Sequence, residues 1–87
     1  MAVETITEAE QEVVRFLAAQ PSLHEIVAFH PSEIVSRRVY DLISAERASE
    51  LSADEERELK TYLYLEHFMR MMKAEAHRRL ADSVLSA

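Results

Sequence analysis

The stretch from Tyr62 to Met72 reads YLYLEHFMRMM, and its hydrophobic pattern decides the fold. Eight of its eleven residues are apolar or aromatic, and only Glu66, His67 and Arg70 interrupt them. An amphipathic helix on a protein surface carries a continuous polar face, which this stretch lacks. We therefore predict a helix that must be covered on more than one side, and we expect a partner chain to supply part of the cover.

The composition of the whole chain favours helices and excludes several kinds of site. The 87 residues include no glycine and no cysteine. The lack of glycine argues against a glycine-rich phosphate loop and most tight hairpin turns. The lack of cysteine excludes a disulfide and a thiolate metal site. A chain rich in Ala, Glu, Leu and Arg without Gly is typical of an all-α protein.

The length and hydropathy indicate a single small domain, here residues 1–87. A chain this short buries only about 60–65% of its unfolded surface, so its own core is marginally stabilising. It has no charged-then-apolar leader and no apolar run of about 18–20 residues. We therefore expect neither secretion nor a membrane span, and we predict a cytoplasmic location.

Helix start signals divide the chain into four helices: two short, one medium and one long. Capping boxes, in which Ser or Thr is followed three residues later by Glu, begin at Thr7, Ser22 and Ser52. Ser32 is expected to cap the third helix, and a proline follows each of the first two. The expected helices span residues 8–20, 22–29, 33–48 and 53–82, and residues 1–6 are expected to be disordered.

The last helix is expected to project beyond the rest of the domain. About 30 residues at a rise of 1.5 Å give a helix of about 45 Å. A compact chain of this size has a radius of gyration of about 12 Å. Acidic residues crowd the first turns of this helix and Arg and Lys its second half, an order that matches the helix macrodipole.

A helical projection at 100° per residue separates two apolar faces on this long helix. The wider face includes Leu59 and Leu63 and is expected to pack on the domain itself. The second face is predicted to be a protein interface, with Phe68 as its anchor, because exposed apolar patches commonly mark interfaces. The predicted interface residues are Tyr64, Phe68, Arg70, Met71 and Met72. The alternative is that the other three helices enclose the long helix completely.

The formal net charge of −6 argues against general nucleic-acid binding. The charge is unevenly spread along the chain. Up to Glu66 there are 14 acids and 6 Lys or Arg, a balance of −8, and from His67 onward 2 acids and 4 bases, a balance of +2. The basic end indicates either a contact surface or the usual preference for bases near a helix C-terminus.

No arrangement of polar residues predicts a reaction. The histidines lack the four-residue spacing of a helical zinc site, and the Glu-x-x-His pattern of di-iron bundles is absent; they are His24, His30, His67 and His77. Glu66 is expected to be partly buried and to pair with Arg70 or Lys73. No nucleophile stands beside a base. We therefore expect no catalytic residue, no metal, no cofactor and no enzymatic activity.

Four short motifs follow one another in the order AFHPS (28–32), SADE (52–55), LEH (65–67) and KAEA (73–76). In this order and spacing they resemble a family of small helical bacterial proteins described as hypothetical or antitoxin-like. The resemblance covers about residues 26–80. Its members are often encoded beside a small nuclease gene, which implies the antitoxin half of a toxin–antitoxin pair. Relatives carry Gly-Thr or similar where this chain has Ser49-Glu50, which argues against a left-handed helix cap there.

The function predicted from these observations is a non-enzymatic interaction protein that binds and neutralises a nuclease-type toxin. Its acidic body suits the basic surface of a nuclease, because opposite potentials speed encounter. The alternative is a self-assembling structural or scaffold homodimer in which the long helix pairs with its copy. A weaker alternative is a DNA-binding autoregulator, for which no basic recognition helix after a short turn is visible.

Overall fold

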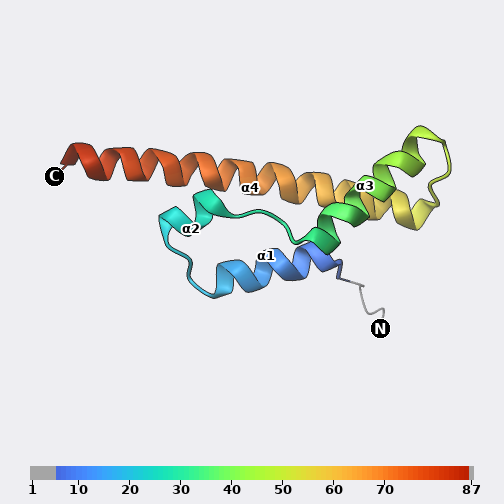
Figure 1. Cartoon of the computed structure of the whole chain (residues 1–87), viewed down its shortest axis with the longest axis horizontal. Coiled ribbons are helices and arrows are strands. Elements are labelled where there is room, and N and C mark those ends of the chain that lie inside the picture. The colour runs from blue at the N-terminus through green and yellow to red at the C-terminus, as the bar shows by residue number, and fades with distance from the viewer. Residues whose placement is uncertain (1–5, 87) are drawn as a thin grey trace.

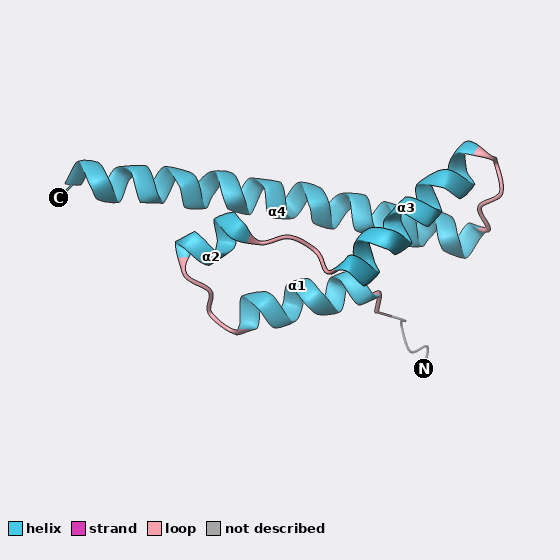
Figure 2. Ribbon diagram, in the orientation of Figure 1, coloured by secondary structure: helices cyan, strands magenta, loops and turns pink. Residues whose placement is uncertain are grey.

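The computed structural model describes residues 6–86, which form four α-helices joined by short connections (Figures 1 and 2). The helices are α1 (Glu8–Ala18), α2 (Leu23–Ala28), α3 (Glu33–Arg47) and α4 (Ala53–Ser86). The described residues contain no strand, and the predicted all-α class is confirmed. α4 continues four residues beyond the predicted end at 82. The predicted disorder of residues 1–6 falls, for residues 1–5, outside the described part of the chain.

The three predicted capping boxes begin α1, α2 and α4. In α4 the Ser52 hydroxyl accepts a hydrogen bond from the backbone N–H of Glu55 at 3.1 Å, and the Glu55 carboxylate accepts one from the backbone N–H of Ser52 at 3.0 Å. The backbone N–H of Ser52 also lowers the pKa of Glu55 from its usual value. Thr7 and Ser22 make the same reciprocal pairs in their helices. Each box satisfies two backbone N–H groups that a helix start otherwise leaves without partners.

α4 forms the long axis of the molecule, and the three shorter helices pack chiefly on it (Figure 1). α3 crosses the N-terminal half of α4, and α2 lies beside its C-terminal half. The last turns of α4 continue past α2, and the side chains of residues 81–85 are exposed. The fold is therefore one long helix, α4, with three short helices packed along one of its sides.

The buried core follows one stripe of α4. Tyr62, Met69 and Ala76 stand seven residues apart, and each is at most 5% exposed. Leu59 joins Tyr62 in a cluster with buried side chains of α1 and α3, of which Leu42 is the most enclosed, at 1% exposed. Seven-residue spacing keeps a stripe nearly straight along an α-helix, so one face of α4 can serve all three short helices.

The molecule is more elongated than a compact chain of its size, and the projection predicted for the last helix is present. Its extents are 54 × 34 × 19 Å and its radius of gyration is 15.9 Å, against about 12 Å for a compact domain. It exposes 6863 Å² of surface, whereas a compact protein of this mass exposes about 5,200 Å². The short helices therefore cover only part of α4.

The N-terminus of α3 is capped from another helix. Ser32 is the cap residue, and its hydroxyl accepts a hydrogen bond from the backbone N–H of Val35 at 3.2 Å. Because Val35 occupies the place of the Glu in a capping box, the reciprocal bond has no local acceptor. Glu12 of α1 takes that role: its carboxylate accepts the backbone N–H of Ser32 at 3.0 Å and the Ser32 hydroxyl. A carboxylate 20 residues away thus completes the cap and joins α1 to α3.

Removing this carboxylate should destabilise the fold. We expect Glu12→Ala to lower the free energy of unfolding by about 1–2 kcal/mol, because a partly buried N–H and hydroxyl lose a charged acceptor. Each kcal/mol lowers the melting temperature of a domain this small by about 4–8 °C, which thermal circular dichroism can measure. Glu33→Ala, which removes an exposed acid in the first turn of the same helix, should cost only a few tenths of a kcal/mol. Equal effects from the two variants would contradict the cross-helix cap.

α3 ends in a left-handed cap without glycine. Ser49 has a φ of 59°. The backbone N–H of Glu50 donates to the Ala45 carbonyl at 2.8 Å, and that of Ser49 to the Glu46 carbonyl at 3.0 Å. These two bonds define a Schellman motif, so the prediction from the Ser49-Glu50 sequence, which argued against such a cap, was wrong. The hydrogen bonds, and the packing of Leu51 against the core, hold a serine in a conformation that glycine adopts more easily.

Glycine at this position should therefore stabilise the protein. We expect Ser49→Gly to raise the free energy of unfolding by about 0.5–1 kcal/mol, because relief of the left-handed strain exceeds the extra entropy that glycine loses on folding. Ala48 is the matched control, because its φ of −86° is ordinary for an L-residue. Ala48→Gly should lower the free energy of unfolding by about 0.5–1 kcal/mol. Urea titrations of both variants and the wild type measure these changes. A loss of stability in both variants would show that the serine is not strained.

Candidate interaction surface

Tyr64, Phe68 and Met71 lie on the side of α4 opposite its buried stripe, and these three residues are termed the outer face. They stand about 100–160° around the helix axis from the buried Met69. Tyr64 is 67% exposed and Met71 51% exposed, while Phe68 is half-buried. Two large side chains at the centre of the longest helix thus leave half or more of their surface uncovered by the described residues.

The other two predicted interface residues are placed differently. Met72 is half-buried and borders the outer face, about 40° around the axis from Phe68. Arg70 lies about 120° from Tyr64, and its guanidinium donates to the Glu66 carboxylate at 2.6 Å. Three of the five predicted residues therefore share one face, a fourth lies at its edge, and Arg70 does not belong to it.

Leu63 was predicted to pack on the domain, and this prediction was wrong. Its side chain is 48% exposed, because the buried stripe is centred on Tyr62 and Met69 and Leu63 stands about 100° and 120° from these two. The projection took the stripe to be wider than it is. With Leu63 and the outer face exposed, the described part of the chain does not enclose α4, which excludes the alternative of a fully covered helix.

Glu66 forms the predicted ion pair with Arg70 but is not partly buried as expected. The two side chains are 61% and 69% exposed. An exposed ion pair of this kind contributes only about 0–1 kcal/mol to stability. Glu66 therefore has an ordinary surface environment.

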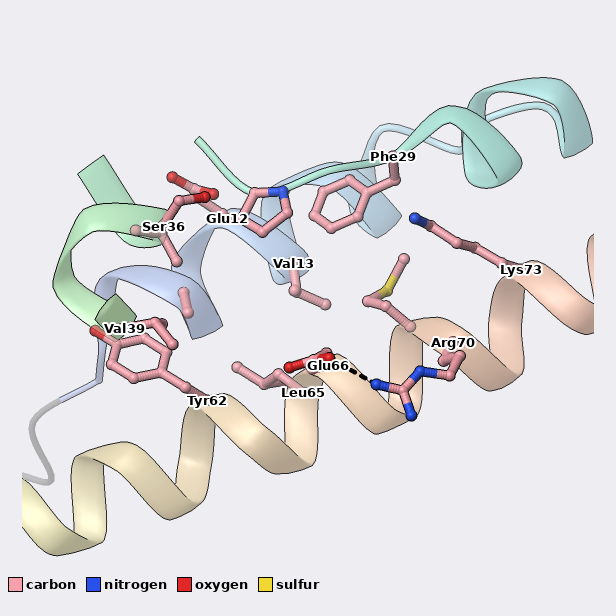
Figure 3. Close-up of a pocket in the computed structure, with 14 residues that line it drawn as sticks. Glu12, Val13, Phe29, Ser36, Val39, Tyr62, Leu65, Glu66, Arg70 and Lys73 are labelled. Carbon is pink, nitrogen blue, oxygen red and sulfur yellow. Dashed lines mark hydrogen bonds and ion pairs between the residues drawn. The ribbon is translucent and has the colours of Figure 1, made fainter. Parts of the chain in front are cut away.

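A pocket of about 460 Å³ opens between α1, the connection from α2 to α3, the first half of α3 and the middle of α4 (Figure 3). Val13, Phe29 and Leu65 contribute to its apolar walls. Both carboxylates that line it are engaged, Glu12 with Ser32 and Glu66 with Arg70, and no histidine lines it. This pocket was not predicted from the sequence, because hydrophobic periodicity indicates which face of a helix is buried and not how closely two faces fit.

A hydrogen-bonded network joins α3 to α4 beside the core. Arg38 donates two bonds to the Glu58 carboxylate, at 2.8 and 2.9 Å, and the Tyr62 hydroxyl donates to the same carboxylate at 2.8 Å. The hydrogen bonds from Arg38 lower the pKa of Glu58. Burial, and then the bond to Glu58, raise the pKa of Tyr62 to about 12. The network ties the two helices together and favours the neutral phenol.

The raised pKa of Tyr62 makes stability depend on alkaline pH. The neutral phenol stabilises the fold fully below the unfolded pKa of about 10, and this contribution is lost as pH rises through the folded pKa. At about pH 9, Tyr62→Phe should be about 1 kcal/mol less stable than the wild type, because the bond to Glu58 is lost. By about pH 11 this gap should shrink by about 1 kcal/mol, since only the wild type loses the tyrosine contribution. Urea titrations at both pH values measure the difference in stability between the wild type and Tyr62→Phe. A difference that did not change with pH would contradict the raised pKa of Tyr62.

Residues 6–86 form neither a metal-binding cluster nor a membrane-spanning helix. No group of three or more His, Asp or Glu side chains between residues 6 and 86 is placed to hold a metal ion. None of the helices in that part of the chain has a stretch long and apolar enough to cross a membrane. The outer face and the pocket therefore stand as the candidate sites.

No family model, no curated protein and no solved structure matches the chain. The family resemblance of the four short motifs thus remains an interpretation of the sequence.

Proposed function

We propose that this protein is a non-enzymatic interaction module that acts by binding another protein. The observation that carries the proposal is the outer face, in which Tyr64 and Met71 are exposed at the centre of a helix 34 residues long. Aromatic residues and methionine are enriched at the centres of protein interfaces. The elongated shape leaves this face accessible along α4.

The partner proposed is a nuclease-type toxin, which the chain would neutralise as an antitoxin. Two observations support this class of partner. The short motifs resemble antitoxin-like proteins, and the chain up to Glu66 carries a formal charge of −8. Glu46, Glu50 and Glu56 are exposed and make no ion pair within residues 6–86. Such carboxylates are available to a basic nucleic-acid site on a nuclease.

A non-catalytic role is supported by the state of the polar groups. The pocket carboxylates are held in a helix cap and in an ion pair, and Glu58 is held by Arg38 and Tyr62. A catalytic acid or base requires a group that can reach a substrate and change its protonation. These carboxylates serve structural contacts.

A self-assembling dimer is the second candidate, favoured by the same outer face. A DNA-binding role is less well supported, because three of the four bases in the basic end of α4 are held in ion pairs. Arg70 pairs with Glu66, and both Arg78 and Arg79 pair with Glu75, at 2.5 and 3.1 Å. A helix that reads DNA instead presents its basic side chains to phosphates.

The proposal predicts that a nuclease gene lies beside the gene for this chain, and the purified product of that gene provides the test. We expect the purified chain to inhibit that nuclease stoichiometrically and to form a complex by size-exclusion chromatography. Because the attraction is electrostatic, raising the salt from about 0.05 to about 0.5 M should slow association. The variant Glu46→Gln/Glu50→Gln/Glu56→Gln should slow association about tenfold at low salt.

The matched control replaces two exposed apolar residues of α3, Ile34 and Tyr40, which are 72% and 71% exposed. Ile34→Ala/Tyr40→Ala should inhibit the nuclease like the wild type. Full nuclease activity in an excess of wild-type chain at low salt would refute the antitoxin proposal.

A further inference from the structure

We propose that the outer face of α4 binds the outer face of a second copy of this chain, with the two α4 helices antiparallel and overlapping along their whole length. This inference rests on the proposed function in one respect, namely that the outer face is a protein-binding surface. It adds the identity of the occupant and the direction and register of the contact. The acidic surface around the α3–α4 turn stays free for a second partner.

The chain as a whole has enough exposed surface for such a dimer. The chain exposes about 1,600 Å² more than a compact protein of its mass. Each partner in an interface of standard size buries about 800 Å². A second copy is also elongated and carries the same exposed face, so two chains can cover each other through one two-fold contact.

The outer face continues into a heptad seam. Residues 57, 64, 71 and 78 form one series with seven-residue spacing, and residues 61, 68, 75 and 82 form a second. Together the two series make the stripe through which two helices pack as a coiled coil. The apolar members, Tyr64, Phe68 and Met71, lie at its centre, and the charged members lie towards its ends. Residues 57, 64, 71, 78 and 82 of the seam are exposed, and residues 61, 68 and 75 are half-buried, so none of the eight is enclosed by the chain itself.

The charged members of the seam select the direction of pairing. In a parallel pair each residue faces its own copy, so Arg57, Glu75 and Asp82 would each meet a like charge, which is unfavourable. In an antiparallel pair the residues of one series face those of the other. Full overlap of residues 53–86 then places Arg57 opposite Asp82 of the second copy.

The same register pairs the apolar residues at the middle of the seam with suitable residues of the second copy. Phe68 lies opposite Met71 of the second copy, and Tyr64 opposite Glu75 of the second copy, within reach of a hydrogen bond from its hydroxyl. The net charges of the two halves of α4 also match. Residues 53–66 hold five acids and two bases, a balance of −3, and residues 67–86 hold two acids and four bases, a balance of +2. An antiparallel pair opposes these halves and the two helix macrodipoles.

The resulting assembly has two α4 helices at its centre and a layer of three short helices on each side. Both apolar faces of the stretch Tyr62–Met72 are then covered, one by the chain itself and one by its copy. The contact is the same on both chains and closes on itself, so the assembly stops at two.

A charge exchange tests the direction and register. Arg57 has a side chain 75% exposed, paired only with the exposed Asp54 of the same helix, and Asp82 is also exposed, so neither substitution disturbs the core. By light scattering and sedimentation, the wild type should be a dimer at about 100 µM, and Arg57→Asp should weaken dimerisation at least about tenfold. Arg57→Asp/Asp82→Arg should restore dimerisation to within about threefold of the wild type. In a parallel pair, residues 57 and 82 of the double variant would each still face a like charge on the copy, and dimerisation would not be restored.

Distances between spin labels provide an independent measurement, because the chain has no cysteine of its own. In the antiparallel register, residue 83 lies opposite residue 56 of the copy, 27 residues from the copy's own residue 83, so labels at Ser83→Cys should be about 40 Å apart. Residue 60 lies opposite residue 79 of the copy, 19 residues from the copy's own residue 60, so labels at Lys60→Cys should be about 30 Å apart. A parallel pair would place both labels within about 20 Å. Circular dichroism should show unchanged helicity in every variant.

The outcomes separate this inference from the proposed function. A monomeric wild type at about 100 µM, short distances at both labels, or a charge exchange that fails to restore dimerisation would each overturn the antiparallel dimer. A monomer that still inhibits the nuclease would leave the antitoxin proposal standing and assign the outer face to the toxin. The dimer with long label distances and no inhibition would support this inference and refute the antitoxin proposal.

Discussion

The packing of three short helices on one stripe of α4 is the contact on which the rest of the structure depends. α1, α2 and α3 contact α4 more than they contact one another, so none of them has a core without it. α2 has only six residues, and a helix that short is not stable in water by itself. Because the buried residues of α4 lie along one side of the helix, its opposite side is more exposed. The elongated shape and the outer face both follow from this one-sided packing.

The remaining contacts compensate for short helices and a small core. Glu12 joins α1 to the start of α3, and Arg38 joins α3 to α4 through Glu58. Each of these is a charged hydrogen bond between elements about 20 residues apart, where hydrophobic area is scarce. Hydrogen bonds are directional, so these polar contacts fix the angles between the helices that they join, which non-directional hydrophobic contacts do not determine.

The features that depend on neighbouring residues could be predicted from the sequence. A capping box is decided within four residues, so the starts of α1, α2 and α4 were predicted correctly. The role of Glu12 depends on a residue distant in sequence, and no local pattern reports it. Leu63 was misplaced because the width of a buried stripe depends on which helices cover it. The grouping of Tyr64, Phe68 and Met71 followed from helical periodicity. The same periodicity places Arg70 about 120° from Tyr64, so its position off this face was also predictable, and its ion pair with Glu66 agrees with that position.

The projecting end of α4 gives one continuous helix two different stabilities. Val84 and Leu85 are 76% and 83% exposed, and beyond α2 the backbone hydrogen bonds of α4 are supported by no neighbouring helix. Isolated helical turns open readily, whereas those around the buried Met69 open only when the packing on α1–α3 is lost. In the single chain, amide exchange along α4 should therefore quicken toward residue 85, and a protease could shorten the helix from that end while the bundle stayed folded, whereas pairing with a second α4 should protect this end.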